Sequence, residues 1–244
     1  MPSQPPRRFC CDEDLARLAY DGLSADVDLT RWRDGKLHPA TRELIEVVRR
    51  EGVKGARVLD IGAGVGAVHV SLLEAGAAAA VDVDASRQYL ATARAEAERR
   101  GLGDRVQYRY GDVVELAGEL PPAEIVTLDS VICCYPYLKP LLAAATRSHP
   151  RLVGITYPRD VWWMRAYMRL FNLAHSILRR PGSYFIHRHA QVGRWMAGAG
   201  YENVHEGGTR EWRVVLYRCL ARPRQRTCSG RPDRSAADPV RPVG

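Results

Sequence analysis

Glycine recurs at alternate positions in one short segment, VLDIGAGVG, which spans residues 58–66. Glycine has no Cβ, so such a loop turns sharply and lets a ligand approach the main chain. Asp60, directly before the glycines, suits a cationic ligand group and would repel a pyrophosphate. The spacing of Gly62, Gly64 and Ala67 also satisfies the dinucleotide pattern G-x-G-x-x-G/A, so a dinucleotide remains open at this point.

Acidic residues end three further apolar segments. Asp84 ends AAAAVDVD and lies 22 residues after Gly62, a spacing at which a carboxylate can accept both hydroxyls of a ribose. Asp84 as a cap of the following helix is the alternative. Asp112 ends RVQYRYGD, and Asp129 closes the apolar part of EIVTLDSV. Carboxylates that follow several strands in this way indicate a site, because loop composition alone does not produce the register.

The elements that must position these residues are short apolar strands alternating with alanine-rich helical stretches. This alternation predicts a parallel sheet wrapped by helices, with the ligand crevice beyond the carboxyl ends of the strands. The segments 202–209 and 211–219 follow each other almost directly, so we expect an antiparallel hairpin there. Helical spacing around Leu15–Ala19 and Leu44–Val48 predicts two helices before the first strand.

Composition separates the ends of the chain from its middle. Residues 1–8 and 221–244 are rich in Pro, Arg, Ser and Gly and are predicted to be disordered, the second as a basic tail. Residues 9–220 are predicted to form one domain, with N-terminal helices in 9–55 and a lid-like helical insertion at 160–186. The six cysteines contain no C-x-x-C pair, so no metal site is predicted.

The net charge of +8 lies mostly in the two ends of the chain. The middle is close to neutral, which favours a small-molecule partner and argues against a nucleic acid. No stretch reaches the roughly 18 apolar residues of a membrane-spanning helix. The first residues, MPSQPPRRFCCDEDL, offer no apolar export signal, so we expect a cytoplasmic location.

Taken in order, VLDIGAGVG, VDVDAS, YRYGDV and IVTLDSV resemble the motifs of class I S-adenosylmethionine-dependent methyltransferases over about residues 40–220. The resemblance implies an α/β, three-layer Rossmann-like fold with a mostly parallel seven-stranded sheet, a C-terminal antiparallel hairpin and helices on both faces. It implies S-adenosyl-L-methionine as the cofactor, with the methionine moiety near the glycines, the ribose at Asp84 and the adenine at Asp112. The implied cofactor-binding residues are Asp60, Gly62, Ala63, Gly64, Gly66, Asp84, Ala85, Asp112, Val113 and Asp129.

A fainter similarity to the magnesium-protoporphyrin IX methyltransferase group covers the N-terminal helices, the glycine loop and an aromatic helix after the fifth strand. That similarity implies esterification of a propionate on a flat, apolar, anionic acceptor, for which no general base is needed. No histidine or lysine directly follows Asp129 in the sequence, in agreement with base-free transfer.

Three residues near the fourth and fifth strands are candidates for the acceptor side. Tyr135 and Tyr157 are predicted to position the acceptor, with a packed aromatic as the alternative for Tyr135. Arg159 is predicted to bind an anionic acceptor, with a pairing to a surface acid as the alternative.

The segment 161–180, VWWMRAYMRLFNLAHSILRR, predicts a helix with apolar residues on nearly every face. A core helix, a lid over a large apolar anionic acceptor and a membrane-interface helix all remain open. We assign Trp162, Trp163 and His187 to the acceptor, and a solvated loop histidine is the alternative for His187. At least one of the two tryptophans is expected to be partly exposed.

The sequence therefore predicts a methyltransferase that acts on a small-molecule acceptor by in-line transfer, without a dedicated protein nucleophile. A NAD-dependent oxidoreductase with the same glycine loop and a non-catalytic partner protein are the alternatives. The expected partners are an apolar, anionic small molecule and a peripheral membrane surface, with no transmembrane segment.

Overall fold

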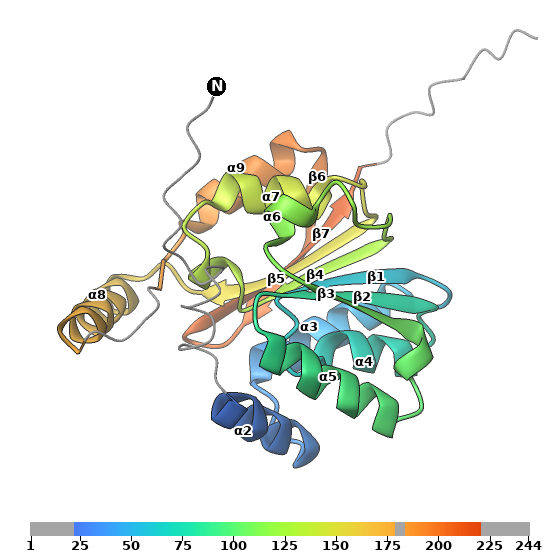
Figure 1. Ribbon diagram of the computed structural model, residues 1–244. Coiled ribbons are helices and arrows are strands. Elements are labelled where there is room, and N and C mark those ends of the chain that lie inside the picture. Colours follow the sequence, from blue (N-terminus) through green and yellow to red (C-terminus); the bar gives the residue numbers. More distant parts are fainter. Residues whose placement is uncertain (1–21, 179–183, 221–244) are drawn as a thin grey trace, which may run out of the picture.

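A seven-stranded sheet lies at the centre of the computed structural model, which describes residues 22–178 and 184–220 (Figure 1). Its strands are β1 (Arg57–Ile61), β2 (Ala79–Asp84), β3 (Val106–Tyr110), β4 (Ile125–Asp129), β5 (Leu152–Pro158), β6 (Tyr201–Gly208) and β7 (Trp212–Cys219). The order is β3-β2-β1-β4-β5-β7-β6. Strands β1 to β5 run parallel, and β7 is antiparallel to both β5 and β6. The predicted sheet and its terminal hairpin are confirmed.

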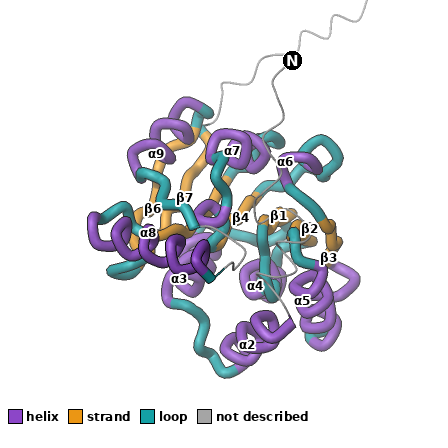
Figure 2. The backbone as a smooth tube through the Cα atoms, turned by 60° about the vertical axis from the view of Figure 1, so that its left-hand side comes forward, coloured by secondary structure: helices purple, strands orange, loops and turns teal. Residues whose placement is uncertain are grey.

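Helices cover both faces of the sheet (Figures 1 and 2). One face carries α3 (Pro39–Arg50), α4 (Ala67–Glu74) and α5 (Arg87–Arg99), and the other carries α6 (Val113–Leu116), α7 (Leu138–Thr146) and α9 (His189–Gly198). Neighbouring residues of β1 divide between them, because side chains of a strand alternate in direction. Val58 belongs to the first apolar cluster, and Leu59 and Ile61 belong to the second. The predicted three-layer architecture is confirmed.

The chain reverses its direction across the sheet between β1 and β4. It proceeds from β1 outward to β2 and β3, and then returns to the other side of β1 with β4 and β5. Such a switch point opens a crevice at the carboxyl ends of the strands. The glycine loop leaves β1 there, and Asp84 and Asp129 end β2 and β4 at the same edge. Two short 3-10 turns, Gly103–Arg105 and Ile132–Cys134, complete the connections.

Helix α2 (Gly22–Arg33) lies against α5 and is held there by charge. The buried carboxylate of Glu96 on α5 binds Arg33 at 2.6 Å and also pairs with Arg99 and Arg100. These three guanidinium groups hold the pKa of Glu96 well below its usual range. α2 lies within residues 9–55, where N-terminal helices are predicted, at positions for which no single helix was predicted. The helix predicted at 15–19, the terminal segments 1–8 and 221–244, and residues 179–183 lie outside the described residues.

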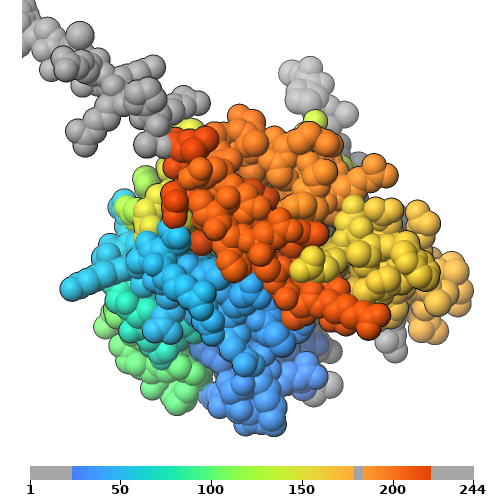
Figure 3. Space-filling view, turned by 180° about the vertical axis from the view of Figure 1, so that it is seen from behind, coloured from blue at the N-terminus to red at the C-terminus, as the bar shows by residue number. Residues whose placement is uncertain are grey.

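Helix α8 (Trp162–Ile177) follows β5 and stands away from the body of the molecule (Figures 1 and 3). Met164 is the one buried residue of this helix, all of which the structure describes. The alternative of a core helix that covers the sheet is therefore wrong. Trp162 is 79% exposed, which confirms that at least one of the two tryptophans is accessible to solvent.

Asp82 is a buried acid on β2 that lies opposite Asp60 of β1. Neither oxygen of Asp82 has a hydrogen-bond partner among the described residues. Burial, together with the nearby Asp84 and Asp60, raises the pKa of Asp82 well above its usual value of 3.8. The folded protein therefore holds a proton on Asp82 at pH values where the unfolded chain does not.

This extra proton predicts how stability changes with pH in the Asp82→Asn variant. Between 3.8 and the raised pKa, the wild type loses about 1.4 kcal/mol of unfolding free energy for each pH unit of increase from this group. Asparagine does not titrate, so the variant should gain stability relative to the wild type as pH rises from 5 to 8, measured by urea unfolding. Asp104→Asn, at an exposed position, is the control. A difference that shrinks or stays constant with rising pH would show that Asp82 is ionised in the folded protein.

Candidate functional site

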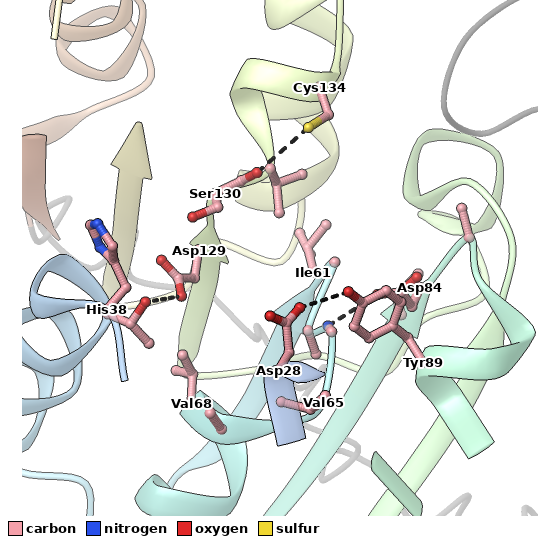
Figure 4. A pocket seen from close by; sticks show the side chains of 18 of the residues that line it. Asp28, His38, Ile61, Val65, Val68, Asp84, Tyr89, Asp129, Ser130 and Cys134 are labelled. Atoms are coloured by element: carbon pink, nitrogen blue, oxygen red, sulfur yellow. Dashed lines mark hydrogen bonds between the residues drawn. The ribbon is translucent and has the colours of Figure 1, made fainter. Parts of the chain in front are cut away.

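A cavity of about 570 Å³ lies at the carboxyl edge of the sheet, at the switch point (Figure 4). Its volume is in the range of small-molecule and cofactor sites. Residues from the α2–α3 region, the glycine loop and the ends of β2, β3 and β4 line it. They include Asp28, Arg31, Lys36, His38, Thr41, Gly62, Ala63, Gly64, Asp84, Ala85, Tyr89, Asp112, Val113, Asp129, Cys134 and Tyr135. The cavity therefore joins the predicted strand-end acids with an N-terminal region for which no site residue was predicted.

The glycine loop needs glycine at two of its lining positions. Gly62 has a φ of 62°, and a Cβ there would lie 2.6 Å from Cγ2 of Val131. Gly64 has a φ of 56°, and its N–H donates to Oδ2 of Asp84 at 3.1 Å. Both positions lie in the left-handed region that side chains disfavour. The hydrogen bond from Gly64 to Asp84 ties the loop to the end of β2, and the main chain of the loop forms one wall of the cavity.

Asp60 and Gly66, both predicted to bind the cofactor, do not line the cavity. Asp60 is fully buried and accepts hydrogen bonds from the Thr127 hydroxyl at 2.6 Å and from the main-chain N–H of His69 at 3.2 Å. Its second oxygen also lies 3.0 Å from Nδ1 of His69. Gly66 is the N-cap of α4. Asp60 and Gly66 therefore support the loop from the core side, Asp60 through its hydrogen bonds and Gly66 as the residue that caps α4.

Asp84 lines the cavity and also supports the surrounding main chain. Its oxygens accept the N–H groups of Gly64 and of Ser86, the latter at 2.7 Å. Burial outweighs these bonds and raises the pKa of Asp84 to about 6. Ser86 is the N-cap of α5, with its hydroxyl accepting from the N–H of Tyr89, so helix capping does not account for Asp84.

Tyr135 lies at the same end of the cavity as Asp112. Its hydroxyl donates to Oδ2 of Asp112 at 2.8 Å, and Oδ1 of Asp112 accepts the N–H of Val114. Tyr89 lines this region as well, and its hydroxyl donates to Asp28 of α2 at 2.7 Å. Tyr135 thus orients a carboxylate that the resemblance assigns to the adenine, whereas the sequence placed it at the acceptor.

Asp129 lies toward the other end of the cavity, on the side of His38 (Figure 4). Its two oxygens accept hydroxyl hydrogens from Thr41 and Thr156, the first at 2.7 Å. Burial raises the pKa of this carboxyl group. Both hydroxyls hold Asp129 in a fixed orientation at the boundary between the two ends.

Three basic side chains from the α2–α3 region line the cavity: Arg31, Lys36 and His38. Lys36 forms an ion pair with Asp34 at 2.9 Å. Nδ1 of His38 accepts the N–H of Ala40 at 3.2 Å, so in the neutral ring the proton is on Nε2. His38 is then a hydrogen-bond donor toward the cavity. Sequence reasoning missed this group because charges between two helices form no motif.

The other predicted acceptor residues do not line the cavity. Tyr157 is buried, and its hydroxyl lies 2.7 Å from Nδ1 of His189. The Arg159 guanidinium donates to the carbonyls of Thr209 and Gly207, so it binds main chain and neither a surface acid nor the cavity.

The residues predicted around α8 also lie away from the cavity lining. Trp162 is in solvent, and the ring of Trp163 lies beneath Arg210 at 5.7 Å. Nε2 of His187 lies 2.8 Å from the main-chain oxygen of Tyr135. His187 therefore contacts the main chain of a lining residue and does not line the cavity itself. His187 is a half-buried loop residue, so the loop position of the alternative is observed together with this main-chain contact.

Part of the sequence is similar to known methyltransferases. Residues 58–150 match the family model described as a methyltransferase domain. A ribosomal protein L11 methyltransferase from Ectopseudomonas mendocina is 32% identical over 146 residues, which are 58% of this chain and 48% of that protein. The chain thus spans about half the length of the curated relatives it matches.

Two solved structures show the same fold. Magnesium protoporphyrin IX methyltransferase from Synechocystis PCC 6803, with bound S-adenosylhomocysteine, has a TM-score of 0.60 at 18% identity and covers 74% of this chain and 81% of that one. An O-methyltransferase family protein from Burkholderia thailandensis has a TM-score of 0.64 at 15% identity and covers 86% of this chain and 64% of that one.

The sheet order and the glycine loop at the switch point give a Rossmann-like fold, which the two methyltransferase structures share. Residues 58–150 match a methyltransferase domain, and the predicted fold is confirmed. Methyl transfer by this chain and S-adenosylmethionine as its cofactor remain proposals. The assignment of single residues to parts of that cofactor remains a prediction.

The raised pKa of Asp84 predicts a pH dependence of cofactor binding. The ionised carboxylate accepts ribose hydroxyls better than the protonated acid does, and protonation becomes substantial below about pH 6. The affinity for S-adenosylhomocysteine should therefore fall about tenfold between pH 7.5 and pH 5, measured by calorimetry.

The matched control is Asp84→Asn. Its affinity for S-adenosylhomocysteine should be weaker at every pH, and it should not fall between pH 7.5 and pH 5, because asparagine does not titrate. If the variant shows the same pH dependence as the wild type, another group is responsible and Asp84 does not bind the ribose.

Proposed function

We propose that this protein transfers a methyl group from S-adenosylmethionine to a small anionic acceptor whose own ionised oxygen is the nucleophile. The observation that carries the proposal is the division of the cavity into two ends. Asp84 lies at one end and His38 lies beside Asp129 at the other (Figure 4), and the basic residues Arg31 and Lys36 line the same cavity.

The acidic end fits the cofactor by its chemistry. Ribose hydroxyls and an adenine amino group are donors, and Asp84 and Asp112 are acceptors between the apolar side chains of Ile61, Val83 and Val113. When bound, S-adenosylmethionine supplies a methyl group that its positive sulfonium already activates. The acidic surroundings of the glycine loop suit that positive charge, and they would repel the pyrophosphate of a dinucleotide.

The basic end fits an anion. Asp34 partly compensates the charge of Lys36, so Arg31 and the Nε2–H of His38 are the main donors toward an acceptor. Arg31 forms no ion pair within the described residues, and its fork of N–H donors matches a carboxylate. Both residues come from a region that Glu96 and Asp28 anchor to α5, so they are held in position over the carboxyl edge.

The lining residues support alignment of the acceptor more than removal of a proton from it. His38, the one histidine in the described lining, donates from Nε2 when neutral and so does not act as a base there. The oxygens of Asp129 accept hydroxyl hydrogens from Thr41 and Thr156. An ionised carboxylate or phenolate needs no base before it attacks, and alignment alone can supply roughly 7–11 kcal/mol.

The direct test is transfer of labelled methyl from S-adenosylmethionine to a metabolite extract, fractionated by size and charge. Label should appear in a small anionic fraction, and the modified acceptor should be a methyl ester or ether. Binding of NADH without binding of S-adenosylhomocysteine would establish the oxidoreductase instead. Cofactor binding without transfer to any fraction would support a non-catalytic partner protein.

Several curated relatives are named for a ribosomal protein acceptor, so the same labelling should include a ribosomal protein fraction. The cavity of about 570 Å³, lined from α2, α3 and β4, favours a small molecule because it admits a compact group. Label that enters a protein band and no small molecule would overturn the small-molecule acceptor.

The Arg31→Gln variant tests whether Arg31 binds the acceptor. Loss of one charge-assisted contact should raise the KM of the acceptor roughly tenfold to a hundredfold, since such a contact contributes about 1.5–3 kcal/mol. The affinity for S-adenosylhomocysteine should stay within about twofold, because the proposal gives Arg31 a contact with the acceptor and none with the cofactor. Arg49→Gln, an exposed arginine of α3 outside the cavity lining, is the control. An equal loss in both variants would remove Arg31 from the acceptor site.

A further inference from the structure

The helix α8 has a continuous exposed apolar face. Trp162, Leu170, Leu173 and Ile177 are 79%, 67%, 56% and 71% exposed, and the exposed Ala166 completes their spacing. These positions recur at intervals of three or four residues or their multiples, so they lie on one side of the helix. Soluble surfaces rarely present so many large apolar groups side by side.

The opposite side of α8 holds the helix to the rest of the protein. Met164 is buried, and the ring of Phe171 packs edge-on against Tyr184 with centroids 5.4 Å apart. The side-chain amide of Asn172 donates to the carbonyl of Tyr184 at 2.8 Å and accepts its N–H at 2.9 Å. The exposed face is therefore fixed outward, because these contacts set the rotation of the helix.

Arginine is the prevailing charged residue along α8 and the segment after it. Residues 161–200 contain six arginines and no aspartate or glutamate. Arg169 is exposed beside the apolar face, and Arg165 is paired with Asp160. Tryptophan and arginine flanking an apolar face are the composition of helices that lie in the interface of a bilayer. None of the described helices is long and apolar enough to cross a membrane.

We propose that α8 docks this protein on an anionic lipid surface, with Trp162, Leu170, Leu173 and Ile177 in the headgroup boundary and the arginines on lipid phosphates. The proposal is independent of methyl transfer. A second copy fits this face less well, since pairing of two such helices brings their Arg169 side chains together, and the helix itself contains no acid to compensate them. Anionic phosphates complement both the apolar face and the charge.

The test is co-sedimentation of the full chain with vesicles of phosphatidylcholine containing phosphatidylglycerol, and with vesicles of phosphatidylcholine alone. The protein should sediment with the anionic vesicles, and raised salt should weaken the binding. Absence of sedimentation with anionic vesicles would overturn the proposal. Equal binding to both vesicle types would overturn the role of the arginines and with it the proposal as stated.

The variant pair Leu170→Glu and Ile177→Glu, made together, should weaken vesicle binding by about tenfold or more. Both side chains are exposed, so the melting temperature should change little. The matched control is Ala91→Glu with Ala143→Glu, which adds the same charge at exposed positions of α5 and α7. Equal binding by the two double variants would show that α8 is not the contact.

Acrylamide quenching of Trp162 fluorescence tests what covers the exposed face of α8. The Trp162 signal is taken as the difference between the wild type and Trp162→Phe. The ring should be accessible without vesicles and shielded with them. Shielding without vesicles at all protein concentrations would mean that another segment of this chain covers α8. Shielding that appears only as concentration rises, with a dimer in sedimentation velocity, would mean that a second copy does. Either result overturns the lipid proposal.

Discussion

The hydrogen bonds of the buried Asp60 carboxylate hold together the carboxyl edge of the sheet, where the cavity lies. The carboxylate binds the Thr127 hydroxyl of β4 and the main chain of His69 in α4, and so joins the two strands at the switch point to the helix that leaves the glycine loop. Because both oxygens are used inside the fold, the loop can turn away from β1 without leaving a buried charge unsatisfied. Asp84 then holds the loop from the other side through the N–H of Gly64. The cavity is shaped by these two acids before any ligand enters.

The two ends of the cavity are built by different parts of the chain. The acidic end belongs to the sheet, where strand register fixes Asp84 and places Asp112 on the turn after β3. The basic residues come from α2 and from the connection between α2 and α3, and their position depends on the contact of α2 with α5. That contact combines the Arg33 and Glu96 ion pair with the Tyr89 hydroxyl bond to Asp28. A site assembled in this way can keep its cofactor end while the acceptor end varies.

The sequence was sufficient for the sheet and most of the acidic end, because alternation of strands and helices and acids at strand ends are local patterns. It could not show that the Asp60 side chain lies in the core, because position in a motif does not show whether a carboxylate points into the cavity or away from it. Arg31 and His38 were missed because their role arises from the packing of α2 on α5, between residues more than sixty positions apart. The helix α8 could not be placed, since apolar residues around a helix are compatible with burial and with an unpartnered surface.

The topology connects the proposed lipid contact to the proposed chemistry. α8 begins directly after the carboxyl end of β5, and that edge of the sheet also carries the cavity. A helix that docks there would bring the carboxyl edge toward the lipid surface, so an apolar anion that partitions into a bilayer would approach from the side of the basic residues. The exposed face of α8 would then serve substrate access by location without touching the substrate. Such a role is compatible with Trp162 being exposed and absent from the cavity lining, although the composition of α8 suggested an acceptor contact.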